Sequence, residues 1–193
     1  MPANNIFSPI VGGSVQTTYV DQMATALPGD LAFNDNSLVD AVIASDSTRY
    51  GIPAGRGIVL SYTESAVRPG VDRMIAKLPA SADTQIDGIV VRNQQMQSNS
   101  NAEPVWFDGR TMNILRTNRV GGRIWVKLQE GSVSSGDEVN VLVGGATPGA
   151  FSPAGTVTIP GAKYLGDFDA SSGPVAALIE VGLQVEPAEE VIP

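Results

Sequence analysis

Apolar and polar residues alternate most clearly in the segment 122–143, GRIWVKLQEGSVSSGDEVNVLV. The apolar positions of this segment are Ile124, Val126 and Leu128, followed after a gap by Val139, Val141 and Val143. A period of two is typical of a strand with one buried face. The gap holds the turn residues Ser134, Ser135, Gly136 and Asp137. The pattern therefore predicts a β-hairpin.

Short strand-like runs continue along most of the chain. Ile58, Leu60 and Tyr62 alternate with polar or smaller residues after a bend at Gly55–Gly57, and further strands are expected in 86–92 and 105–107. Three more candidates follow near the C-terminus: TVTIP, AKYLGDF and PVAALIEVGLQV. The chain has 21 Gly and 13 Pro, dispersed between the apolar runs, which indicates many turns. We predict an all-β fold: a single β-sandwich or barrel-like, jelly-roll-like domain.

One run is ambiguous between strand and helix. Residues 37–44, SLVDAVIA, place Leu38, Val42 and Ile43 at helical spacing, and Ser37 is suited to cap a short helix. The run is also bounded by turn residues on both sides and is short. We favour a strand.

The sequence predicts that the chain is divided into three parts. Residues 1–26 are expected to form an extended N-terminal arm, in which Ile6, Phe7 and Tyr19 pack on the body or on a neighbouring subunit. A first edge strand is an equal alternative. Residues 27–185 are expected to form the β-rich body, and 186–193 a flexible acidic tail.

The body contains a polar loop at 93–104 whose first part reads NQQMQSNSN. Such a composition offers little apolar area to offset the entropy lost on ordering, so we expect an exposed and mobile loop. It is interpreted either as a solvated loop or as a surface finger that contacts a partner.

A second candidate contact lies on the predicted strand 122–128. Arg123, Trp125 and Lys127 share the face opposite its apolar residues. Trp and Arg together are typical of protein contact surfaces. The alternative is that a loop of the same chain covers Trp125.

The net charge is −8, yet all twelve Lys and Arg residues lie between Arg49 and Lys163, so both ends are acidic. Acidic ends would repel phosphate backbones, so direct nucleic-acid binding is not expected. The sequence has no Cys and no His, which excludes thiolate chemistry and imidazole-based proton transfer or metal binding. We expect no cofactor and no metal. No basic and apolar leader and no membrane-spanning run is apparent, so synthesis in a cytoplasm is expected, without membrane insertion.

Catalytic templates are almost entirely missing. The motifs GxSxG, GxxxxGK[ST], HExxH and CxxC do not occur. The glycines Gly51, Gly55 and Gly57 precede a predicted strand rather than a helix, so they are interpreted as turn residues. Carboxylate pairs such as Asp137/Glu138 or Asp167/Asp169 stay open as candidates for glycosidase-like chemistry. A calcium loop at 167–169 is a weaker candidate, because the remaining oxygen ligands are missing.

Several fragments, in this order, give the chain a resemblance to a known family. They are PGDLAF, IPAGRGIVLSY, GGRIWVKLQEG, SGDEVNVLV, GAFSPAG, PGAKYLGDF and VAALIEV. Together they resemble the structural cement proteins of tailed bacteriophages. Residues 93–101 and 186–193 have no counterpart in that resemblance.

The resemblance implies a non-enzymatic decoration protein on the outer surface of an icosahedral head, made in the cytoplasm of the host bacterium. The implied partners are the major capsid protein and other copies of the chain, with a trimer favoured and a dimer second. The candidate contact residues are Ile6, Phe7, Tyr19, Arg123, Trp125 and Lys127. Two rivals are a carbohydrate- or host-binding domain of a phage tail or fibre, and a β-sheet enzyme with a carboxylate pair.

Overall fold

The computed structural model describes residues 26–32, 39–45, 50–64, 70, 72–100, 103–118 and 122–182, and all of its regular elements are strands. The first eight are β1 (Val39–Ala44), β2 (Ile52–Pro53), β3 (Gly57–Glu64), β4 (Asp72–Lys77), β5 (Gly88–Val90), β6 (Gln97–Ser98), β7 (Pro104–Trp106) and β8 (Thr111–Arg116). The other six are β9 (Gly122–Leu128), β10 (Ser132–Val133), β11 (Glu138–Val141), β12 (Val157–Tyr164), β13 (Phe168–Asp169) and β14 (Val175–Val181). The all-β prediction is confirmed.

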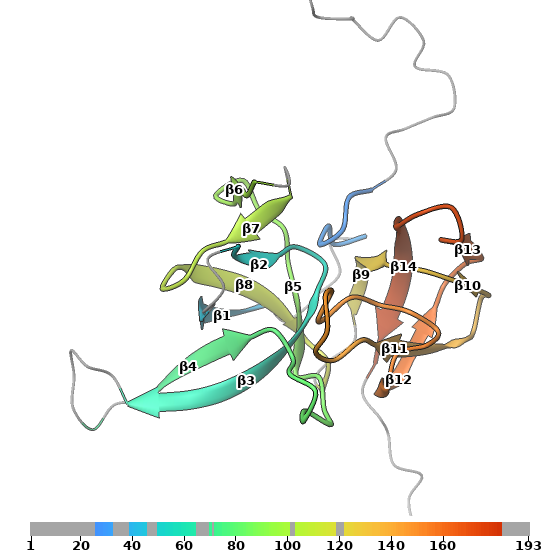
Figure 1. Ribbon diagram of the computed structural model, residues 1–193. Coiled ribbons are helices and arrows are strands. Elements are labelled where there is room, and N and C mark those ends of the chain that lie inside the picture. The colour runs from blue at the N-terminus through green and yellow to red at the C-terminus, as the bar shows by residue number, and fades with distance from the viewer. Residues whose placement is uncertain are drawn as a thin grey trace, which may run out of the picture.

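The strands form two bodies that lie side by side (Figure 1). In the first body, five strands close a small barrel in the order β1-β4-β3-β5-β8. Only the β1–β4 pair in this ring is parallel. A three-stranded sheet, β2-β7-β6, accompanies the barrel. Full closure leaves no unpaired barrel edge, which removes a site of unwanted strand pairing.

The second body is built on a four-stranded sheet in the order β11-β12-β14-β9. Phe151 connects its two outer strands, because it forms isolated bridges with both Leu128 of β9 and Val141 of β11. The Phe151 side chain is fully buried. One apolar residue thus closes the sheet on itself and fills its interior.

Two strands of the first body contribute to both apolar cores. Strands β5 and β8 are apolar on both faces: Val90 and Ile114 point into the first barrel, whereas Ile89 and Leu115 pack with the core of the second body. A strand buried on both faces loses the simple polar alternation. This explains why Ile89, Val90 and Val91 are consecutive apolar residues in the sequence.

Two glycines join the bodies at their backbones. The Gly29 amide donates to the Trp125 carbonyl on β9 at 2.6 Å, and the Gly29 carbonyl accepts from the Arg92 amide at 2.8 Å. Gly55 also contacts both bodies, since its amide donates to Val90 and its carbonyl accepts from Lys127. A Cβ added to Gly55 would lie 2.6 Å from the Cβ of Pro28. The joint therefore requires glycine for its close approach as well as its φ of +68°.

The predicted hairpin at 122–143 is wrong in its pairing, although its alternation is correct. β9 buries Ile124, Val126 and Leu128, as expected. However, β9 pairs with β14 and β11 pairs with β12, at opposite edges of the sheet. The predicted turn at Ser134–Asp137 does form, but it connects β11 to β10, and β10 pairs with β13. Turn residues predict a change of direction but do not select the partner strand.

The other predictions of elements have mixed outcomes. The strand interpretation of 37–44 is confirmed by β1, and Gly55 lies in a turn that precedes β3. TVTIP and AKYL are joined in one strand, β12, which passes through Pro160 and a Gly161 with φ of +73°. Proline is tolerated in a strand at such irregular positions.

The polar loop contains more structure than its composition predicts. Asn93 accepts a hydrogen bond from the Gln95 amide through its side chain at 2.8 Å, Met96 packs against the first core, and Gln97–Ser98 pair with β7. Most side chains of 93–98 are exposed, as expected, and the mobility of the loop stays a prediction. A local side-chain to backbone hydrogen bond and one partly buried methionine provide contacts in a segment that has little apolar area overall.

We predict that Gly55→Ala destabilises the protein much more than Gly109→Ala. Both glycines have positive φ, +68° and +76°, but only Gly55 would bring its new Cβ against backbone and side-chain atoms. The conformational cost of about 1–2 kcal/mol applies to both variants, and the steric cost applies to Gly55 alone. Urea unfolding monitored by tryptophan fluorescence measures the difference. Equal decreases in the free energy of unfolding of the two variants would show that the joint is not tightly packed.

We also predict that Tyr164→Phe leaves stability at pH 7 unchanged or raises it by about 1 kcal/mol, because the buried hydroxyl has no hydrogen-bond partner. Burial, followed by the negative charge of Asp137, raises the pKa of Tyr164 well above its ordinary value. The wild-type protein therefore loses stability as the pH rises above about 10, where the unfolded phenol ionises. The free energy of unfolding of the Tyr164→Phe variant should decrease less over the same range, as measured by unfolding between pH 7 and 11.

Candidate functional site

The three contact residues predicted on β9 do share one face. Arg123, Trp125 and Lys127 are half-buried and alternate with the fully buried Ile124, Val126 and Leu128. The paired strand β14 extends this face, since Trp125 lies opposite Leu178 and Arg123 lies opposite Glu180. We call the face formed by Arg123, Trp125, Lys127, Leu178 and Glu180 the β9–β14 face.

Each of the three residues also has a partner within the chain. Arg123 Nε donates to Glu180 Oε1 at 3.0 Å, and Lys127 Nζ forms an ion pair with Glu103. The rings of Trp125 and Phe168 meet edge to face, with centroids 6.2 Å apart. The chain therefore covers part of Trp125 itself, in line with the alternative interpretation. The Arg123–Glu180 pair is still 40–47% exposed and is accessible to a partner.

The Lys127–Glu103 pair belongs to a group of charges at the joint between the bodies. Burial alone would raise the pKa of Glu103, but the hydrogen bond and charge of Lys127, together with Arg56, lower it below its ordinary value. Arg56 is only 5% exposed, and burial lowers its pKa while Glu103 partly opposes this effect. The joint thus holds two cations around one carboxylate.

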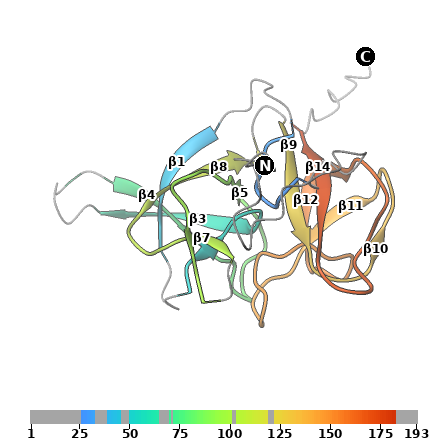
Figure 2. The same cartoon turned by 90° about the horizontal axis from the view of Figure 1, so that it is seen from above.

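Exposed aromatic residues mark a second surface that the sequence pattern did not single out. Tyr62 is 69% exposed, and Ile58 and Leu60 precede it in the same alternating row of β3. Its neighbour across the strand pair is Met74 of β4. Both views show the β3–β4 hairpin extending outward on the side away from β9–β14 (Figures 1 and 2). The apolar row of β3 therefore continues past the end of the barrel core, a point that a single sequence cannot locate.

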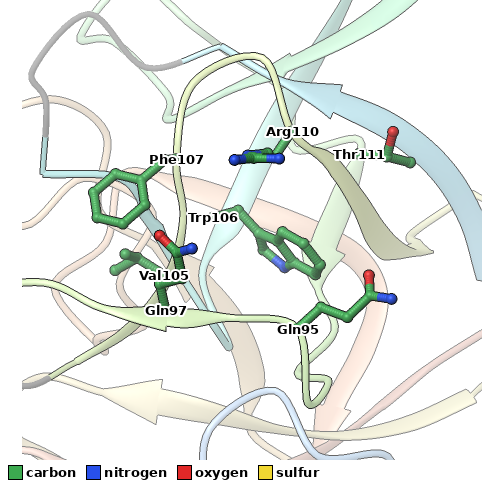
Figure 3. A pocket seen from close by; sticks show the side chains of 7 residues that line it. All are labelled: Gln95, Gln97, Val105, Trp106, Phe107, Arg110 and Thr111. Carbon is green, nitrogen blue, oxygen red and sulfur yellow. The ribbon is translucent and has the colours of Figure 1, made fainter.

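A cleft of about 380 Å³ lies on the first body beside β6, β7 and β8 (Figure 3). Gln95, Gln97, Arg110 and Thr111 provide its polar groups, with Phe107 among its lining residues. Trp106 also lines it, but this ring is 4% exposed and belongs to the core of the barrel. A carbohydrate-binding site needs an open aromatic face, and the Trp106 ring does not offer one.

Most of the acidic residues considered for catalysis stabilise turns by accepting hydrogen bonds. Asp137 accepts from the Ser134 amide at 2.7 Å and Asp167 accepts from the Ser135 amide at 2.9 Å. Asp169 accepts from the hydroxyl and the amide of Ser171 and from the Ser132 hydroxyl, and these hydrogen bonds lower its pKa. Glu138 is exposed at the start of β11. Among the described residues, no group of three or more Asp or Glu side chains is arranged to hold a metal ion.

The predicted arm residues Ile6, Phe7 and Tyr19 lie outside the described residues, as does the acidic tail 186–193. The segment that follows the predicted arm is described, and it runs along β9. Leu31 bridges Ile124, and the Trp125 amide donates to the Asp30 carbonyl at 2.9 Å. Residues 29–32 thus cover the outer edge of β9. Within the described residues, no helix is long and apolar enough to cross a membrane.

We predict that Glu103→Gln lowers the free energy of unfolding by about 1–2 kcal/mol at pH 7, because it removes the charged partner of a largely buried Lys127. The pKa of Glu103 is lowered in the folded state, so its contribution is present above the ordinary value of 4.5 and is lost as the pH falls below it. The two proteins should converge in stability in acid. Unfolding curves between pH 3 and 7 test this, with the exposed Glu138→Gln as a control that stays within about 0.5 kcal/mol.

Comparison with known protein families matches residues 15–184 to the family described as Structural cement protein (E217 gp24/Pam3 gp6). A search of curated proteins gave no match. The matched range includes every strand of both bodies. It therefore confirms the resemblance seen in the order of the sequence fragments. The chain belongs to the family of phage structural cement proteins.

Proposed function

We propose that this protein is a non-enzymatic capsid cement protein that binds the outer surface of an icosahedral phage head. It stabilises contacts between neighbouring major capsid protein subunits. The observation that carries the proposal is the family match over 170 of the 193 residues, from 15 to 184. The chemistry of the chain is compatible with such a role, which requires adhesion rather than a reactive group.

Two separate surfaces support a bridging role. The β9–β14 face lies on the second body, and the β3–β4 hairpin with its exposed Tyr62 extends from the first (Figure 1). Contacts at two distant points let one molecule hold two subunits, and the second contact forms at high effective concentration once the first has formed. Modest contacts repeated over a shell then add up to a large gain in stability.

The predicted arm provides a third contact in this proposal. Ile6, Phe7 and Tyr19 precede residues 29–32, which pair along the edge of β9. A segment that begins beside the β9–β14 face can extend that contact onto a neighbouring subunit. The domain division also remains a proposal: arm 1–26, cement body 27–185 and acidic tail 186–193.

We expect purified protein to bind expanded empty capsids stoichiometrically and to raise the temperature at which the shells disrupt. Tyr62→Ala should weaken binding by about fivefold or more, because truncating an exposed aromatic anchor removes its buried area in the complex. Co-sedimentation and thermal disruption of the shells measure the two effects.

Arg73→Ala is the matched control for Tyr62→Ala. Arg73 lies on the same hairpin and is exposed, but it pairs with Thr63 on the opposite face. The affinity of the Arg73→Ala variant for the capsids should lie within about twofold of that of the wild-type protein. Shells that gain no thermal resistance from the wild-type protein would contradict the proposed function. Equal losses for the two variants would contradict the role of Tyr62.

We also propose that the protein acts as a homo-oligomer, with a trimer favoured over a dimer, because closed symmetric assemblies match the symmetry axes of a shell. Light scattering of the purified protein should give three times the chain mass of 20.1 kDa, or twice that mass for a dimer. A single-chain mass at micromolar concentration would argue against an oligomer before attachment.

A further inference from the structure

A second cleft, of about 360 Å³, lies at the joint between the bodies. Its walls come from the Tyr50–Arg56 segment on one side and the loop 145–148 on the other, with Asn99 and Glu103 between them. Tyr50 on its border is 61% exposed, so the cleft is open to solvent. The sequence patterns assigned no binding role to any of these residues.

Arg56 brings a nearly buried cation into this cleft. Its side chain is 5% exposed, and among the described residues its guanidinium donates one hydrogen bond, from Nη1 to the Thr147 carbonyl at 3.1 Å. Nε is buried without a hydrogen-bond partner. A guanidinium carries five N–H donors, and a buried charge with most donors unused is costly unless an anion compensates it.

The loop opposite Arg56 supplies neutral donors. Gly144 and Gly145 both have positive φ, +66° and +69°, and start the loop that carries Ala146 and Thr147. Among the backbone hydrogen bonds of the described residues, the amides of Gly145, Ala146 and Thr147 donate none. Glycine-rich turns with free amides are a recurrent way to bind anions. Arg56 and residues 145–147 line the same cleft.

Within the part of the chain that the structure describes, Glu103 is the one acidic residue that lines the cleft. Its carboxylate is already paired with Lys127, and Arg56 adds a second nearby cation. The local charge of Arg56, Lys127 and Glu103 is therefore +1, in a chain whose net charge is −8. A small anion is attracted to this position in spite of the acidic background.

We propose that the Arg56 cleft is an oxyanion-binding site that takes a carboxylate or phosphate group. The ligand accepts hydrogen bonds from the guanidinium and from the amides of residues 145–147. A cation is excluded by the buried positive charge. An uncharged ligand would leave that charge uncompensated. The inference does not rest on the proposed function, because the site is contained in a single isolated chain.

The test is a titration of the isotopically labelled full-length protein with inorganic phosphate, with acetate and with a short capped peptide that contains one Glu. Chloride keeps the ionic strength constant, so general screening cannot imitate binding. The amide resonances of Gly145, Ala146 and Thr147 should shift saturably. The resonance of Gly136, an exposed turn glycine that does not line the cleft, should not. A higher affinity for phosphate, or for acetate and the Glu peptide, shows which class of anion the site prefers.

Two variants are expected to change the affinity for the anion in opposite directions. Arg56→Lys keeps the charge but loses the planar fork, so it should weaken binding by about tenfold. Glu103→Gln removes the competing carboxylate and should tighten binding by about threefold or more. Arg92→Lys is the matched control, because Arg92 lies near the joint but does not line this cleft. It should bind as the wild type does.

The wild-type titration tests the proposed site even if a variant does not fold. Shifts that follow ionic strength alone, or that spread evenly over the protein, would overturn the proposal. So would unchanged affinity in a folded Arg56→Lys variant. Shifts confined to residues 145–147, together with opposite changes in the two cleft variants, would establish the site.

Discussion

The close approach of Gly29 to Gly55 is the contact on which the rest of the structure depends. Each glycine binds a strand of both bodies through its own amide and carbonyl, so four backbone hydrogen bonds cross the joint at two residues. Cβ atoms at these positions would meet Ala54 at 2.8 Å and Pro28 at 2.6 Å. Only residues without a side chain allow the strands to come this close. The relative position of the two bodies follows from it.

The joint also explains why charged groups gather where two apolar cores meet. Arg56 follows Gly55 directly, Arg92 donates its amide to Gly29, and Lys127 donates its amide to Gly55. Their backbones are needed at the joint, so their charged side chains lie close to it, and that of Arg56 is almost fully buried. Glu103 compensates part of the charge through Lys127. The clefts beside the joint therefore combine charged and apolar lining residues.

The apolar pattern of β9 illustrates what one sequence can predict. Burial of Ile124, Val126 and Leu128 on one face, and the common face of Arg123, Trp125 and Lys127, followed from a period of two. The family could also be predicted, because the order of several weak fragments is more specific than any one of them, and the family match agrees with it. The partners of Arg123, Trp125 and Lys127 could not be predicted. Glu180, Phe168 and Glu103 lie far from them in the chain.

The sequence by itself determined the local geometry: strands where apolar residues alternate, turns where Gly, Pro, Asn and Asp cluster, and a chemistry without Cys or His. Tertiary structure alone decided the pairing of β9 with β14, the closure of the second sheet by Phe151 and the burial of Arg56 at the joint. The reason is physical. Alternation and turn preference act over a few residues, whereas strand pairing and burial depend on which distant segments together exclude the most water.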